Sequence, residues 1–184
     1  MRLRELTLDL ADIQISDEQS QLRSRGLHVS QIIRHIMVVT GLEEKGDFTE
    51  DDLNMFAVIG RLWEQMLADA IFKPPRYQRP GEIELDGIYG SPDAVDTDDG
   101  VLVEFKVTWK SSNRAIESFF KYKLQVMAYC HMLQLTRCRL YVFYVCGNWK
   151  PPVPQIKAWE IEFTPVELRD NWKMLRENGK EITL

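Results

Sequence analysis

The chain has 184 residues with the composition of an ordinary globular protein, 45% hydrophobic and 28% charged, and its formal net charge is −5. That length suits one domain with a substantial core, and no apolar run is long enough to span a membrane. The negative charge argues against a protein that coats nucleic acid without specificity, because such binding needs a dense excess of lysine and arginine. Three cysteines without a CxxC pair, and no signal-peptide stretch at the N-terminus, lead us to expect a reducing, cytoplasmic location.

Two helices are predicted in the first part of the chain. Residues 1–26 are polar, and we expect an arm or edge strand followed by a loop. Residues 29–40 carry isoleucine and valine at helical spacing. A second helix is expected to begin at Thr49, with acids in its first turn, and to carry an apolar stripe as far as Ile71, where the prolines that start at Pro74 stop it.

Short strands and one long helix are predicted next. Residues 82–89, 92–97 and 101–108 have the composition of strands, and the last two are joined by an Asp-Asp-Gly turn at 98–100. The periodicity of residues 113–135 then predicts a helix.

The C-terminal part begins with an almost continuous apolar run over residues 139–146, which is typical of a strand buried on both faces. A proline-rich loop over 147–154 separates it from an alternating strand at 156–163, and Pro165 opens a last helix. The element order predicts an α/β domain, in which helices flank a mixed central sheet.

We expect residues 1–184 to form a single domain. Within it, residues 1–48 would form an N-terminal arm and helix, residues 49–146 the core that carries the chemistry, and residues 147–184 a C-terminal strand and helix.

Charged residues interrupt the apolar strand at 101–108. Side chains alternate along a strand, so Glu104 and Lys106 share one face. Such charges are costly to bury unless they are paired or bind a metal. The hairpin that turns at 98–100 would bring Asp93 to the level of Glu104 and Lys106. A solvated surface pair is the commoner meaning of an isolated Glu-x-Lys sequence, so the pattern needs support from other residues.

Two helices offer that support. Glu64 lies on or beside the apolar stripe of the second helix, where a carboxylate is either a boundary residue or a ligand that faces the sheet. Gly60, one turn earlier, would let this helix approach the sheet closely. Gln125 and Tyr129 are four residues apart and therefore share a helix face. By themselves they could simply form a hydrogen bond at the edge of the core.

Four short sequences, taken in chain order, resemble the motifs of the PD-(D/E)xK nuclease superfamily, in its RecB-like branch, which includes phage exonucleases of the lambda type. They are Gly60-Arg-Leu-Trp-Glu64, Gly90-Ser-Pro-Asp93, Glu104-Phe-Lys106 and Gln125-Val-Met-Ala-Tyr129. The resemblance covers residues 60–129. It implies a restriction-endonuclease-like αβββαβ core and phosphodiester hydrolysis with Mg²⁺ or Mn²⁺.

The resemblance also implies a metal site. Glu64, Asp93 and Glu104 would supply the hard oxygen ligands that these ions prefer, together with the main-chain carbonyl of Phe105. Cysteine-rich members of the family hold an iron–sulfur cluster through one early and several late cysteines. No cysteine precedes Cys130 here, so no such cluster is expected.

The remaining motif residues have implied roles around that site. Lys106 would orient or deprotonate the attacking water and stabilise the transition state. Gln125 and Tyr129 would support the site and the DNA strand that enters it, and Trp109 either stacks on an unpaired base or packs in the core. Further DNA contacts are expected from nearby cations: Arg61, Lys73, Arg76, Arg79, Lys110, Arg114, Lys121 and Lys123.

The resulting hypothesis is a metal-dependent DNA exonuclease that acts on ends or single strands in recombination, repair or phage DNA processing, in a bacterial or phage-infected cell. Two alternatives stay open: a structure-selective or restriction-like endonuclease, and a non-catalytic nucleic-acid-binding module on a nuclease fold. Because the chain is short, we expect processivity to need a homo-oligomer or a recombination or replication partner.

Overall fold

The computed structural model of the protein describes residues 26–42, 59, 60, 62, 63, 66, 75–150 and 153–182. The expected N-terminal arm therefore lies outside the described residues, as do Glu64 and most of the predicted second helix. Of that helix, Ile59, Gly60, Leu62, Trp63 and Met66 are described, and all five have helical backbone.

Two sheets form the framework, and the larger has the order β2-β5-β6-β7-β8. Its strands are β2 (Tyr77–Gln78), β5 (Ala94–Asp96), β6 (Val101–Thr108), β7 (Arg137–Tyr144) and β8 (Gln155–Glu162). Strands β6 and β7 are parallel, whereas the other neighbours are antiparallel. The smaller sheet has the order β1-β4-β3 and consists of β1 (Leu27–His28), β4 (Ile88–Gly90) and β3 (Ile83–Leu85). The predicted mixed sheet is thus confirmed.

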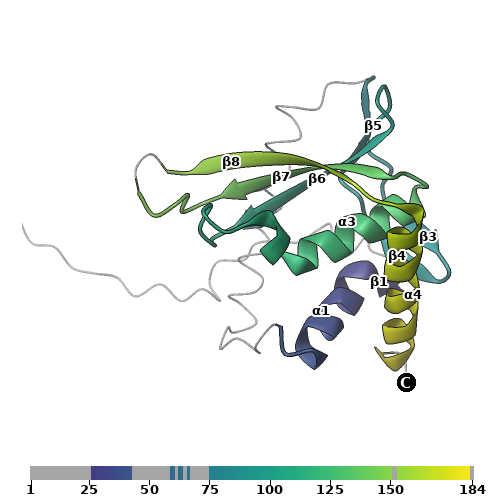
Figure 1. Ribbon diagram of the computed structural model, residues 1–184. Helices are drawn as coiled ribbons and strands as arrows, with labels where there is room; N and C mark the ends of the chain where they lie inside the picture. Colours follow the sequence, from purple (N-terminus) through teal and green to yellow (C-terminus); the bar gives the residue numbers. More distant parts are fainter. Residues whose placement is uncertain are drawn as a thin grey trace, which may run out of the picture.

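The described helices are α1 (Val29–Val39), α3 (Phe120–Met132) and α4 (Pro165–Ile182), with the short 3₁₀ helix η3 (Ile116–Ser118) before α3. Helix α3 lies directly against the large sheet, and α1 and α4 pack against α3 and against each other (Figure 1). This arrangement confirms the predicted α/β class. No helix among the described residues combines the length and apolarity needed to cross a membrane.

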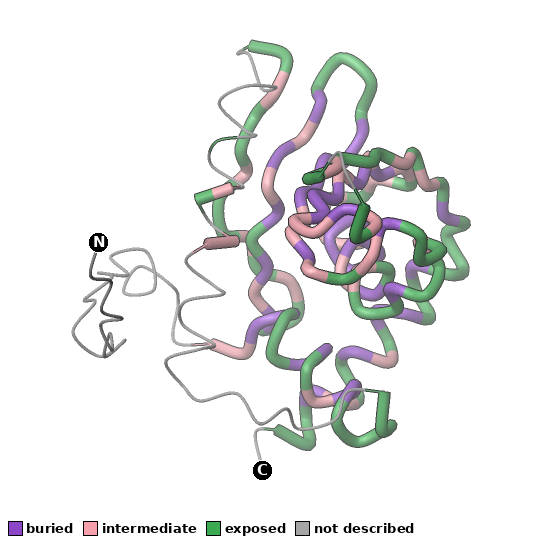
Figure 2. The backbone as a smooth tube through the Cα atoms, turned by 90° about the vertical axis from the view of Figure 1, so that its left-hand side faces the viewer, coloured by how far each residue is buried: buried purple, intermediate pink, exposed green. Residues whose placement is uncertain are grey.

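The two faces of the large sheet have different neighbours. Leu102, Leu140 and Val142 belong to the main core between the sheet and the helices. Phe105 and Phe143 form a smaller cluster on the opposite face, where the Trp63 ring stacks on that of Phe143 with centroids 4.3 Å apart. Most residues of β6 and half or more of those of β7 are buried. In Figure 2 the buried residues gather inside the tube trace, and exposed residues occupy much of its outside. The alternation along β6 therefore directs Glu104 and Lys106 towards α3.

Several predicted boundaries were wrong. The single strand expected at 82–89 is the hairpin β3–β4, because Asp86 and Gly87 both have positive φ, 54° and 77°, and reverse the chain. The helix expected from residue 113 begins only at Phe120. Strands β7 and β8 begin two residues and one residue earlier than expected.

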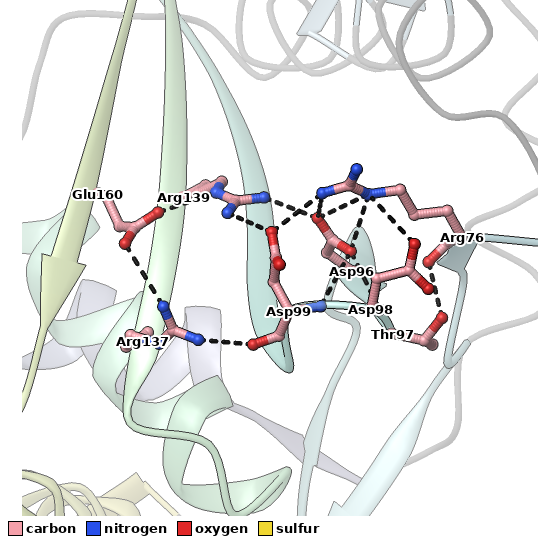
Figure 3. A network of polar contacts seen from close by, with 8 residues as sticks. All are labelled: Arg76, Asp96, Thr97, Asp98, Asp99, Arg137, Arg139 and Glu160. Carbon is pink, nitrogen blue, oxygen red and sulfur yellow. Dashed lines mark hydrogen bonds and ion pairs between the residues drawn. The ribbon is translucent and has the colours of Figure 1, made fainter.

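An ion-pair network links the strands at one end of the large sheet (Figure 3). Asp96, at the end of β5, is fully buried and accepts hydrogen bonds from Arg76 Nη2 at 2.8 Å and Arg139 Nη1 at 2.7 Å. Arg139 also pairs with Asp99 and Glu160. Arg76 was expected among the DNA-contacting cations, but its guanidinium pairs with Asp96 and Asp99. The Arg76 hydrogen bond keeps the pKa of Asp96 below its ordinary value.

We expect Asp96→Asn to unfold at lower urea concentration, with a loss of roughly 1–3 kcal/mol, because two arginines lose their charged acceptor. A lowered pKa means that Asp96 stabilises the fold at pH values above its unfolded pKa of about 3.9, and that this contribution disappears as the pH falls through the lower folded value. The stability difference between wild type and variant should therefore shrink in acid. Urea titrations at pH 7 and at about pH 3 measure it, and an equal difference at both would contradict the assignment.

Candidate metal centre

The β5–β6 hairpin brings two carboxylates together. The register pairs Ala94 with Val103, so Asp93 lies level with Glu104 just beyond the last paired residue of β5. Asp93 Oδ2 accepts a hydrogen bond of 2.7 Å from the Phe105 N–H, and the Asp93 N–H lies 3.4 Å from Glu104 Oε2. The Asp93 side chain thus takes the place of a strand neighbour for Phe105.

The orientation of Phe105 bears on its expected role as a ligand. The N–H and C=O of one strand residue point to the same neighbouring strand. Since the Phe105 N–H reaches Asp93, the Phe105 carbonyl lies on the Asp93 side of β6 too. Two side-chain carboxylates and one main-chain oxygen are therefore available on the same side of the hairpin end.

Lys106 neutralises one of these acids. Its Nζ lies 2.6 Å from Glu104 Oε1, and the Glu104 side chain is only 1% exposed. Asp93 is half-buried; desolvation raises the pKa of its carboxyl, and the Lys106 charge and the Phe105 hydrogen bond oppose that rise. The hairpin therefore concentrates buried negative charge beside a single lysine, and such a cluster is suited to a cation.

Helix α3 contributes the next two residues. Gln125 Nε2 donates to the Tyr129 hydroxyl at 2.9 Å. Burial, with the nearby Glu104 charge, raises the pKa of Tyr129 to about 12, so the phenol keeps its proton at neutral pH. The helical spacing predicted that Gln125 and Tyr129 share a face, and this face is turned towards the acids of the hairpin.

Gly90 allows the Tyr129 ring to take this position. A Cβ on Gly90 would lie 2.8 Å from Tyr129 Cε1 and 3.0 Å from Met132 Sδ, closer than real contacts allow. The glycine of the Gly-Ser-Pro-Asp sequence therefore brings the β4 backbone against the tyrosine.

We expect Gly90→Ala to lose about 1–3 kcal/mol of stability and to displace Tyr129 from the site, because the added methyl overpacks the contact. Gly60→Ala is the matched control: no described atom lies within 4 Å of a Cβ there. Urea unfolding and the near-ultraviolet tyrosine signal measure the two effects. Equal stability of Gly90→Ala and wild type would contradict this role.

Gly60 was expected to allow close helix–sheet approach. Among the described residues no atom lies within 4 Å of a Cβ at this position, and the expected close approach stays a prediction. Trp63 places these helical residues on the Phe105 face of the sheet. The position of Glu64 lies outside the described residues, so its expected role as a ligand stays a prediction.

The residues of the candidate site line a pocket of about 130 Å³. Five of the six side chains expected at the site line it: Asp93, Glu104, Lys106, Gln125 and Tyr129. Gly90 and Ser91, which belong to the predicted Gly90-Ser-Pro-Asp93 motif, line it too. The sequence reasoning missed four further lining residues, which come from α1 and the small sheet: His28, Val29, Ser30 and Tyr89.

His28 is the missed residue with the most chemistry. It precedes α1, is 7% exposed, and its Nδ1 lies 3.8 Å from Glu82 Oε2. Strand β1 pairs His28 with Tyr89, and the two rings lie 5.7 Å apart. Only two residues form β1, and its partner strand begins sixty residues further along, so no local pattern could have predicted this position.

The oxygen donors of the site are of the chemical type that binds a hard divalent cation. Two carboxylates and a main-chain carbonyl are oxygen donors of the kind that Mg²⁺ and Mn²⁺ prefer. Within the described part of the chain, no cluster of three or more acidic, histidine or cysteine side chains could hold a metal ion. A complete ligand set would therefore include main-chain oxygen, water, or an acid outside the described residues.

Two solved structures share the fold that surrounds this pocket. The crystal structure of SSO0001 has a TM-score of 0.58 at 15% identity, over 90% of this chain and 82% of that one. The crystal structure of an alkaline exonuclease from Laribacter hongkongensis, LHK-Exo, has a TM-score of 0.53 at 15% identity, over 91% of this chain and 93% of that one. No family model and no curated protein sequence matches the chain. The likeness is one of fold.

Proposed function

We propose that this protein is a nuclease that hydrolyses phosphodiester bonds in DNA with Mg²⁺ or Mn²⁺, acting as an exonuclease on ends or single strands. The observation that carries the proposal is the contact set at the hairpin end, where Asp93, Glu104 and Lys106 meet. The likeness of the fold to an alkaline exonuclease supports the same class of reaction.

In this proposal Asp93, Glu104 and the Phe105 carbonyl hold the cation, with Glu64 as the expected further ligand. A divalent ion held there would neutralise charge on the scissile phosphate and lower the pKa of a water molecule. Proton transfer and positioning then depend on the residues of the chain itself.

Lys106 is placed to act on the attacking water. Its ammonium group contacts Glu104 in the structure, and its flexible stem lets the same group turn towards a water or a phosphate oxygen in the pocket. A positive charge there stabilises the extra negative charge of the pentavalent transition state. The Tyr129 hydroxyl, which stays protonated, can donate a hydrogen bond to the same substrate.

The pocket size supports reaction at one phosphate at a time. A pocket of about 130 Å³ has room for a phosphate group. The rest of a DNA strand must therefore lie on the surface around the pocket.

Metal binding and substrate topology test the proposal. Electron paramagnetic resonance of Mn²⁺ with the protein should show a bound fraction that Asp93→Ala reduces. With either metal, linear DNA should be degraded while covalently closed circles stay intact. Cleavage of the closed circles would show that the protein is an endonuclease and not an exonuclease. Mn²⁺ binding without any cleavage would favour a non-catalytic binding module.

A further inference from the structure

Two segments at the end of the large sheet beyond Thr108 contain basic residues and no acid in their own sequence. In a chain of net charge −5, no acid occurs between Glu104 and Glu117, and none between Arg139 and Glu160. These two segments are the loop that follows β6 and the β7–β8 hairpin. Their cations beyond the catalytic lysine are Lys110, Arg114, Lys150 and Lys157.

Three acids at the other end of the same sheet form ion pairs with arginines. Asp96, Asp99 and Glu160 bind the arginines at the start of β7 (Figure 3). Strand β7 therefore runs from a neutralised network to a cationic tip, and the segregation of charge follows from the fold.

Hydrogen bonds join the two cationic segments into one surface. The Ser112 N–H donates to the Gly147 carbonyl at 2.8 Å, and its hydroxyl donates to Gln155 Oε1 at 2.7 Å. Lys157 Nζ donates to the Ser112 carbonyl at 2.5 Å. Because Ser112 is buried, the loop after β6 is fixed against the hairpin.

The hairpin presents an exposed aromatic ring. Trp149 is 66% exposed, and its φ of 67° is unusual for a bulky residue. A hydrogen bond of 2.9 Å from its N–H to the Cys146 carbonyl holds this turn, and the next N–H, of Lys150, donates to Asn148 Oδ1 at 2.9 Å. Figure 1 shows the ends of β7 and β8 that lead into this loop extending beyond the helices.

The strands β6 and β7 connect this surface to the pocket. Strand β6 leads from Glu104 and Lys106 directly into the loop of Lys110, and Lys106 pairs with Val142 on β7. Val142 and Trp149 are seven positions apart in the sequence, which limits the distance between them to about 25 Å. A strand held at the pocket therefore needs only a few nucleotides to reach the ring.

We propose that Lys110, Arg114, Trp149 and Lys150 form a hairpin-tip surface that binds single-stranded DNA next to the pocket. The cations neutralise phosphates, and the exposed indole stacks on a base, which requires that the base is unpaired. This proposal rests on the proposed function for the placement of the strand, and it adds the single-stranded substrate class and the residues that select it.

Binding without metal tests the surface apart from cleavage. A fluorescein-labelled oligo(dT) of about 16 nucleotides is titrated with the full chain in EDTA, and fluorescence anisotropy gives the affinity. Trp149→Ala should weaken binding about tenfold or more, whereas Trp149→Phe should keep most of it because phenylalanine also stacks. Lys150→Ala should weaken binding and reduce its salt dependence. Lys173→Ala, on α4 with a side chain 75% exposed, is the matched control and should change neither.

Three results would overturn the hairpin-tip surface: no oligo(dT) binding by wild type, wild-type affinity of Trp149→Ala, or equal losses for Lys150→Ala and Lys173→Ala. An equal loss of duplex binding in Trp149→Ala would overturn the single-strand preference. Since the titration contains no metal, failure of DNA cleavage would refute the proposed function and leave this result standing. Normal cleavage with unchanged oligo(dT) binding in Trp149→Ala would refute only the surface.

Discussion

Asp93→Asn should lower the rate of DNA cleavage by roughly 10²–10³ while the protein stays folded. Asparagine keeps an oxygen that can accept the Phe105 N–H, so the local backbone contact survives and only the negative charge is lost. Because the pKa of Asp93 is raised by desolvation, removing its charge should cost little stability. Cleavage rates in Mg²⁺ and urea midpoints of the same preparation measure the two quantities.

Asp96→Asn is the matched control for this variant. The two aspartates lie on the same hairpin, but Asp96 faces the arginine network and not the pocket. The pair should separate cleanly: Asp93→Asn loses cleavage and keeps stability, whereas Asp96→Asn loses stability and keeps cleavage where it is folded. Full activity of Asp93→Asn would exclude this carboxylate from the reaction.

Lys106→Met should lower cleavage by about 10²–10⁴ and also destabilise the protein by about 3 kcal/mol. Methionine keeps most of the stem, so the loss comes from the ammonium group, whose removal leaves the buried Glu104 carboxylate without its lysine. Added Mg²⁺ should restore part of the stability, since a cation again neutralises the site, but it should not restore cleavage. Urea unfolding with and without Mg²⁺, beside cleavage rates, measures this split.

Lys173→Met, on the exposed side of α4, controls for the loss of one positive charge and should change neither property. A Lys106→Met variant that cleaves DNA normally would remove the lysine from the mechanism. If Mg²⁺ does not change the stability of the Lys106→Met variant, that result would argue against cation binding at Glu104.

The sequence predicted the central hairpin well because its signals are local. The apolar run of residues 101–108 ends at turn residues on both sides, and β6 has these same bounds. Alternation along that strand placed Glu104 and Lys106 on one face, and helical spacing placed Gln125 beside Tyr129. Each inference needed only residues within one element or one turn.

The features that were missed depend on contacts between distant segments. His28 reaches the pocket through a two-residue pairing with β4, which no periodicity reveals. The late start of α3 at Phe120 accompanies a loop that is fixed by Ser112 to the β7–β8 hairpin. The Asp86-Gly87 turn is different, because its dipeptide is a known hairpin signal and could have divided the predicted strand.

Arg76 shows a limit of counting cations along a sequence. A basic residue near a candidate site suggests contact with DNA, but the structure pairs this one with the buried Asp96. Charge in the sequence does not reveal which cations are neutralised by acids from other strands.

Release of labelled nucleotides from end-labelled linear DNA, single- and double-stranded, tests the central claim most directly. Purified wild-type protein should release short products with Mg²⁺ or Mn²⁺, none with EDTA, and almost none as Asp93→Asn in either metal. Intact DNA after incubation of folded wild-type protein with both metals, or equal cleavage in EDTA, would contradict the account.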